Sequence, residues 1–184
     1  MSRTLTSGMV DVTVAPVVRP AYFVRMVFDS GESPNVLNLW SGVGDLAYGG
    51  NTYTGVGDLL SISAVTETSD ISATGINVAI TGIKSSFLVI AKNHEYQGRP
   101  LSVSLGAFDD NGALIADPVI VFSGFMDTMT IAESGSTATI KISVENKLIS
   151  FERSKVRRYT AEDQKIDYPT DKGFEFVTAI VEKE

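Results

Sequence analysis

The chain has 184 residues, of which 15 are Lys or Arg, 22 are Asp or Glu and one is His, and its formal net charge is −7. It contains no cysteine, which excludes disulfide bonds, Cys-ligated zinc, iron–sulfur clusters and a cysteine nucleophile. The single histidine, His94, excludes a poly-histidine metal site within one chain and leaves only one base for a Ser/His/Asp triad. We therefore predict a protein without enzymatic activity and without a metal or cofactor.

Length and hydropathy predict one soluble domain, or a domain with an appendage. The longest apolar runs, such as residues 87–91, are far short of the roughly 20 residues that span a bilayer. The amino end has no continuous apolar core of the kind found in a signal peptide. We expect no membrane insertion and synthesis in a cytoplasm-like compartment. The acidic charge argues against nucleic acid as an equilibrium ligand, because Lys and Arg drive phosphate binding.

Three regions follow one another along the chain. Residues 1–20 form an N-terminal segment with weak helical spacing over residues 4–14. Residues 21–150 form a β-rich region, in which apolar and polar residues alternate and turn residues recur at intervals of about ten residues. The strands that this alternation predicts are 21–28, 36–40, 52–54, 60–65, 76–80, 101–108, 118–125, 126–131 and 137–144. Residues 85–92 lack alternation and are predicted to be helical.

Residues 151–184 form the third region, predicted to be a charged, extended arm followed by a C-terminal helix over residues 173–184. Phe174, Val177 and Val181 share one face of that helix. The predicted fold is mainly β, an antiparallel β-barrel or sandwich with short helices at the N-terminus, near residues 85–92 and at the C-terminus.

A glycine-rich motif occurs twice, as Gly42-Val-Gly44-Asp45-Leu46 and again as Gly55-Val-Gly57-Asp58-Leu59. With Ala47, the first copy fits the dinucleotide pattern G-x-G-x-x-G/A, but that pattern binds phosphate only before a helix, and a turn and a strand follow here. We favour two tight turns flanking a short hairpin, with Asp45 and Asp58 capping the turns. Asp45 and Asp58 could also form a glycosidase acid/base pair if they shared one cleft.

Two other polar motifs are interpreted as structural. Residues 109–112 resemble a calcium loop, but Ala107 occupies the first ligand position, so we predict a hairpin turn at Asn111-Gly112. His94 lies in a polar loop without a Ser or Asp at recognisable spacing. We expect it to be solvated.

Several short segments of the chain resemble those of a known protein family. The segments concerned are Leu39-Trp40-Ser-Gly42, Tyr48-Gly-Gly50, Thr52-Tyr53-Thr-Gly55-Val-Gly57-Asp58-Leu59-Leu60, Ile62-Ser63, Glu67-Thr68, Gly82-Ile83, Gly98-Arg99, Phe122-Ser-Gly124-Phe-Met-Asp127, Glu145-Asn146 with Leu148, Arg158-Tyr159-Thr160, Asp163-Gln164 and Asp171-Lys-Gly173-Phe-Glu-Phe176. Together they resemble tail-tip or baseplate hub structural proteins of long-tailed bacteriophages and related gene transfer agents.

The resemblance implies a virion structural protein that connects the tail tube to the distal tip, in a ring around the DNA path. The implied partners are copies of the same chain in a trimer or hexamer and other tail proteins, namely tube, distal tail, hub or fibre proteins, with DNA only in transit. Related hub proteins carry additional enzymatic or iron–sulfur regions. This chain has no cysteine to bind an iron–sulfur cluster, and its 184 residues leave no room for another domain, so we expect a purely structural protein. We expect a virion protein made in the host bacterial cytoplasm.

We predict three groups of residues at subunit interfaces: a tryptophan at the end of a strand, a cluster of basic residues on an otherwise acidic protein, and two phenylalanines near the C-terminus. They are Trp40, Arg153, Lys155, Arg157, Arg158, Phe174 and Phe176. An alternative function is a carbohydrate-binding β-sandwich that recognises host glycans through Trp40, Tyr48 and Tyr53 near the glycine-rich turns.

Overall fold

The computed structural model describes residues 5–29, 35–57, 60–65, 74–81, 85–115, 118–134, 137–152 and 158–177. The chain divides into two compact units, Met1–Ile149 and Ser150–Glu184, which we call the N-terminal unit and the C-terminal unit. Among the described residues no helix is long and apolar enough to cross a membrane.

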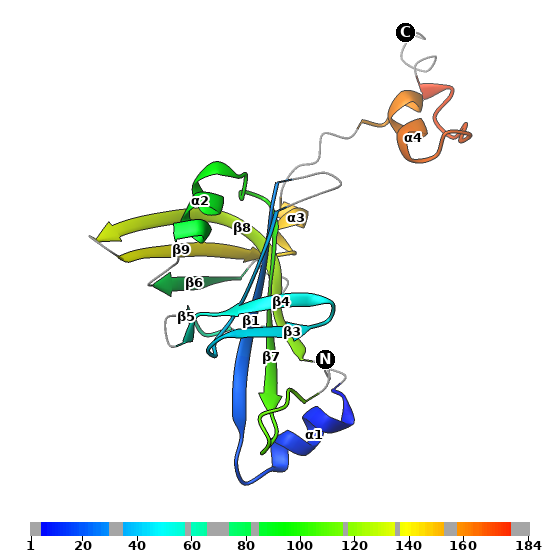
Figure 1. Ribbon diagram of the computed structural model, residues 1–184. Helices are drawn as coiled ribbons and strands as arrows, with labels where there is room; N and C mark the ends of the chain where they lie inside the picture. The colour runs from blue at the N-terminus through cyan, green and yellow to red at the C-terminus, as the bar shows by residue number, and fades with distance from the viewer. Residues whose placement is uncertain are drawn as a thin grey trace. The chain divides into compact units, whose positions relative to one another are not determined.

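The N-terminal unit is built on one nine-stranded sheet, which confirms the mainly β prediction (Figure 1). The sheet is not closed into a barrel, and its strand order is β3-β4-β2-β1-β7-β8-β9-β6-β5. It is mixed instead of wholly antiparallel, because β2 and β4 run parallel over two residue pairs. The strands are β1 (Arg19–Phe28), β2 (Asn35–Trp40), β3 (Asp45–Tyr48), β4 (Asn51–Gly55), β5 (Leu60–Ile62), β6 (Gly75–Thr81), β7 (Pro100–Phe108), β8 (Val119–Ser134) and β9 (Thr137–Asn146).

The long strand β8 joins the two halves of the sheet. Its first part pairs with β7 and its second part with β9, and the ladder register shifts between Met126 and Met129. Residues 118–125 and 126–131, expected as two strands, are therefore one strand with an irregularity, which lets it bend. Figure 1 shows β1 and β7 running across the direction of β6 and β9.

The main core lies between the two halves of the sheet. It consists of the alternate residues of the strands, among them Val24, Val78, Val103 and Val144, none of which is exposed to solvent. Helix α2 (Ser85–Asn93) covers this core with Phe87, Leu88, Ile90 and Ala91. Its position confirms the helix expected over residues 85–92.

The N-terminal helix α1 (Ser7–Val14) is also confirmed. Thr6 caps it, since its side-chain oxygen accepts a hydrogen bond from the N–H of Met9 at 3.4 Å. Met9 is buried.

Strand β1 is buried on both faces. Val24, Met26 and Phe28 face the main core, whereas Ala21 and Phe23 face a second cluster formed with the β3–β4 hairpin. Successive side chains of a strand point to opposite faces, so one strand anchors both clusters.

The C-terminal unit differs from the extended arm that we expected. Helix α4 (Ala161–Asp167) occupies part of it, capped by Thr160, whose Oγ1 accepts from the N–H of Asp163 at 3.3 Å. A shorter helix, α3 (Ile149–Glu152), begins at the last residue of the N-terminal unit and continues into the C-terminal unit. Residues 173–176 form a turn, and residues 178–184 of the predicted C-terminal helix lie outside the described residues.

Candidate interaction surfaces

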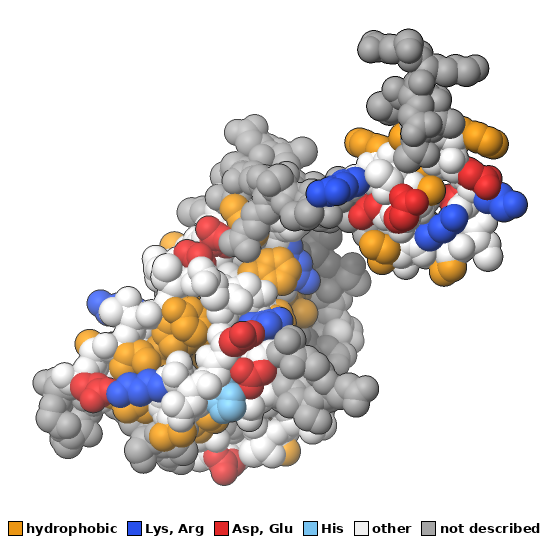
Figure 2. Space-filling model, turned by 90° about the horizontal axis from the view of Figure 1, so that it is seen from above, with side chains coloured by type: hydrophobic (Ala, Val, Ile, Leu, Met, Phe, Trp, Pro, Cys, Tyr) orange, Lys and Arg blue, Asp and Glu red, His pale blue; other side chains and the backbone are white. Residues whose placement is uncertain are grey.

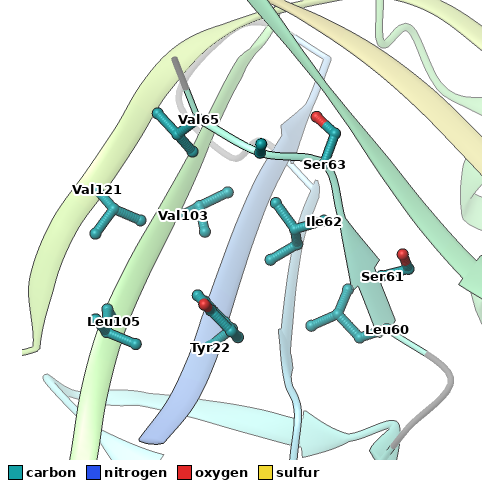
Figure 3. Close-up of a pocket in the computed structure, with 10 residues that line it drawn as sticks. Tyr22, Leu60, Ser61, Ile62, Ser63, Val65, Val103, Leu105 and Val121 are labelled. Carbon is teal, nitrogen blue, oxygen red and sulfur yellow. The ribbon is translucent and has the colours of Figure 1, made fainter. Parts of the chain in front are cut away.

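An apolar groove opens beside the edge strand β5, and we call it the β5 groove. Its walls are residues 60–65 on one side and Tyr22, Val103, Leu105 and Val121 on the other, and its volume is about 590 Å³. Figure 3 shows Leu60 and Ile62 projecting from β5 into the groove, opposite Tyr22 of β1 and Leu105 of β7. The groove continues the main core outward, because Leu60, Ile62 and Val65 also pack against that core. Strand periodicity alone did not predict this groove, which depends on the curvature of the sheet.

The two glycine-rich motifs lie side by side. The N–H of Gly55 donates to the carbonyl of Gly44 at 2.8 Å, and the N–H of Gly57 donates to the carbonyl of Gly42 at 2.9 Å. A Cβ at Gly55 would lie 2.5 Å from the carbonyl oxygen of Gly42, so this backbone contact requires glycine. Strand β3, and not a helix, follows Gly44. This agrees with the interpretation of the motif as a structural turn and not as a dinucleotide-binding loop.

Trp40 is half-buried and holds the first glycine motif in place. Its Nε1–H donates to the carbonyl of Gly44 at 2.9 Å. Its ring stacks on Phe23, with centroids 6.3 Å apart, and tilts against Phe108. Tyr53 meets Phe23 edge-on at 5.3 Å, and burial raises the pKa of Tyr53 above its usual value. The aromatic residues near the glycine-rich turns are therefore packed on one another.

His94 is held by a carboxylate that the sequence did not connect to it. Its Nδ1 lies 2.6 Å from Oδ2 of Asp29 and 3.2 Å from the side-chain amide of Asn35. The backbone N–H of Glu95 donates to the other oxygen of Asp29 at 2.9 Å. Figure 2 shows the histidine at the surface beside acidic side chains. His94 is partly exposed, and the Asp29 that it contacts lies 65 positions away in the chain, so local spacing could not identify this partner.

The Asp29 cluster joins the end of β1 to the connection between α2 and β7. A hydrogen bond from Asn35, followed by those from Glu95 and His94, lowers the pKa of Asp29 below its ordinary value. Asp29 itself has a φ of 61°, a left-handed conformation that Asp tolerates better than most residues. These contacts indicate a structural clamp.

The described residues of the remaining carboxylate motifs form no common site. Asp45 is exposed, and Asp58 lies outside the described residues, so the proposed acid/base pair is not placed. Asp109 accepts hydrogen bonds from the N–H groups of Asn111 and Ala113, and this makes the predicted turn. In the described part of the chain no group of three or more His, Asp or Glu residues could hold a metal ion.

The predicted interface residues of the C-terminal unit are only partly described. Arg153, Lys155 and Arg157 lie outside the described residues, and Arg158 is exposed. Phe174 is half-buried against Tyr159, with ring centroids 6.1 Å apart, whereas Phe176 is 70% exposed. Sequence analysis missed three further exposed apolar residues of this unit, Tyr159, Ile166 and Tyr168.

Comparison with known proteins finds a similarity of fold. No protein-family model matches the chain, and no curated protein sequence matches it significantly. Among solved structures, the fold is similar to a chain of the "virion of native gene transfer agent (GTA) particle", with a TM-score of 0.58 and 14% sequence identity over 84% of this chain. The match covers 49% of that chain, so this chain spans about half the length of its structural neighbour.

Proposed function

We propose that the chain is a structural protein of a phage-like virion, positioned at the tail tip or baseplate hub. Copies of the chain form part of a ring that connects the tail tube to the distal tip and surrounds the DNA path. The observation that carries this proposal is the fold shared with a chain of a gene transfer agent virion over 84% of the present chain. The segments named in the sequence analysis resemble the same class of proteins.

The sheet supports assembly in one direction. Strands β3 and β5 stand at opposite ends of the strand order, so no described strand pairs with their outer edges. Because the two ends of the sheet differ, contacts between copies are expected to be heterologous, and heterologous contacts close into a ring when the rotation permits, without strand pairing at β5. Trimers and hexamers are both compatible with such contacts.

Charge supports the same role. A net charge of −7 gives a wall that offers DNA little phosphate neutralisation, so DNA in transit does not adhere. The exposed Arg158 and Phe176 belong to the proposed interface with neighbouring copies or with tube, distal tail, hub or fibre proteins. Trp40 contributes to the proposed interface indirectly, because its side chain holds the glycine-rich loop at Gly44 in place.

The alternative, a glycan-binding sandwich, is less well supported. A sugar platform needs the open face of an aromatic ring, whereas Trp40, Tyr48 and Tyr53 pack against Phe23. We likewise propose a role without catalysis.

Particles made by the encoding bacterium provide the test. Mass spectrometry of purified particles should detect the chain, and electron cryomicroscopy should place it in a ring at the tail tip. Deletion of its gene should give particles that lack the tip, and complementation should restore them. A chain that is missing from purified particles and strictly monomeric by light scattering would contradict the proposal.

A further inference from the structure

The outer edge of β5 presents backbone groups to the β5 groove. Strand β5 is last in the strand order and pairs antiparallel with β6, Ser61 lying opposite Ala79. The N–H of Ser63 donates to the carbonyl of Asn77 at 2.9 Å. In an antiparallel pair, alternate residues direct their N–H and C=O groups toward the partner strand. Ser61 and Ser63 therefore face β6, while the backbone groups of Leu60, Ile62 and Ala64 face away from it.

The floor beside this edge is apolar. Val103, Leu105 and Val121 line it, and none of the described residues of the lining is charged. Tyr22 brings a hydroxyl group to the groove, whereas Ser61 and Ser63 point away from it in Figure 3, and the Ser63 hydroxyl accepts a hydrogen bond from the N–H of Asn77 at 2.9 Å. With a volume of about 590 Å³, it accepts several uncharged side chains, and a charged side chain placed there would lose its hydration without a partner.

We propose that the β5 groove binds an extended segment of another protein, which adds to β5 as a further antiparallel strand. Main-chain hydrogen bonds to Ile62 and Ala64 supply affinity, and apolar side chains at every second position of the segment fill the groove. This inference goes beyond the virion role and does not depend on it.

A different protein fits the groove better than a second copy of this chain. The interior strands of the sheet are paired on both sides, so a second copy could offer only an edge strand without giving up an existing pairing. Its own β5 would bring Leu60 and Ile62, which already pack against the main core of that copy. The other edge strand, β3, directs Leu46 and Tyr48 into its own aromatic cluster. It would present Asp45, whose charge the apolar lining does not match.

A binding measurement with the full chain tests the proposal. The probe is a fluorescein-labelled, capped peptide of alternating Val and Thr, about eight residues long to match a typical strand. Fluorescence anisotropy should show saturable binding. Methylation of the Val amides, which face β5 in an antiparallel pair, should weaken binding by at least about tenfold, and methylation of the Thr amides should leave it nearly unchanged. The reverse pattern is expected for parallel addition and would overturn the antiparallel assignment. Equal binding of both methylated peptides would overturn strand addition altogether.

Matched variants locate the site. Leu105→Lys places a charge in the groove and should weaken binding by at least about tenfold, whereas Ile120→Lys, at a position 59% exposed and outside the groove lining, should not. Ala64→Pro removes one outward N–H at an exposed residue and serves as the second variant if Leu105→Lys does not fold. Retained binding in Ala64→Pro and in a folded Leu105→Lys would overturn the proposal.

Hydrogen exchange distinguishes the possible occupants. The peptide should protect the amides of Ile62 and Ala64 and leave that of Ser63, already bonded to Asn77, unchanged. Protection of Ile62 and Ala64 that rises with protein concentration in the absence of peptide would identify a second copy as the occupant and overturn the assignment to another protein.

Discussion

At the scale of single residues, Gly42 is held against the ring of Trp40. A Cβ at Gly42 would lie 1.9 Å from a carbon of that ring, and the ring is backed by Phe23 and Phe108. We expect Gly42→Ala to lower the free energy of unfolding by about 1–3 kcal/mol through overpacking. Most of this loss should disappear in a Trp40→Leu background, because the smaller side chain leaves room. Urea unfolding followed by circular dichroism measures the four corners of this double-mutant cycle.

Gly112→Ala is the control for that cycle. Gly112 has a φ of 78° and nothing within 4 Å of an added Cβ, so its substitution costs only backbone strain. Its effect should add to that of Trp40→Leu within about 0.5 kcal/mol. Equal coupling of both glycines to Trp40 would contradict the packing argument.

Asp29 makes the stability of the N-terminal unit depend on pH. The hydrogen bond from Asn35, followed by those from Glu95 and His94, lowers its pKa in the folded state. The carboxylate therefore stabilises the fold above its unfolded pKa of about 3.9, and this contribution is lost as the pH falls through the lower folded pKa. Asp29→Asn should lower the urea midpoint at neutral pH, and the difference from the parent chain should shrink toward zero in acid.

Asp110→Asn provides the comparison for Asp29. Asp110 pairs with Arg19, but its side chain is 90% exposed, and exposed pairs contribute little. Its urea midpoint should follow that of the parent chain across the whole pH range. A difference for Asp29→Asn that persists undiminished below the folded pKa would show that the side-chain amide itself disrupts the clamp.

At the scale of elements, the β3–β4 hairpin is held to the sheet by few backbone bonds. Its parallel ladder with β2 covers two residue pairs, so the packing of Tyr53 on Phe23 carries much of the attachment. Phe23→Ala should cost about 3–5 kcal/mol and raise amide exchange in residues 45–54 more than in β8 and β9. Met26→Ala, in the main core on the opposite face of β1, should raise exchange throughout the sheet. Amide exchange that rises equally in residues 45–54 and in β8 and β9 in both variants would contradict a separate role of Phe23 in holding the hairpin.

Local patterns predicted the elements that their own residues specify. Alternation in residues 101–108 and 137–144 predicted β7 and β9, because those strands bury one face. Strand β3 belongs to the short hairpin expected between the two glycine-rich turns, but alternation did not identify it as a separate strand, since it has four residues and its apolar positions pack on the distant Phe23. Helix α4 was also missed because it buries none of its residues and has no apolar stripe, although Thr160 before Asp163 offered a capping signal. The Asp29–His94 clamp and the β5 groove could not be predicted from local periodicity, because both bring together residues that are far apart in the sequence.

At the scale of the whole molecule, the C-terminal unit presents large apolar side chains on its described surface. Ile166, Tyr168 and Phe176 are exposed, at 70%, 63% and 70%. Under the proposed virion role, we infer that these residues contact a neighbouring subunit.

Truncation separates folding from assembly. A chain of residues 1–152 should unfold within about 1 kcal/mol of the full chain, because the N-terminal unit has its own core, and it should fail to enter particles. In the full chain, Phe176→Ser should reduce incorporation without lowering the unfolding midpoint. Ile120→Ser, also exposed but on the N-terminal unit, controls for a general loss of apolar surface. Normal incorporation of the truncated chain would exclude the C-terminal unit from the interface and place the contacts between copies on the N-terminal unit.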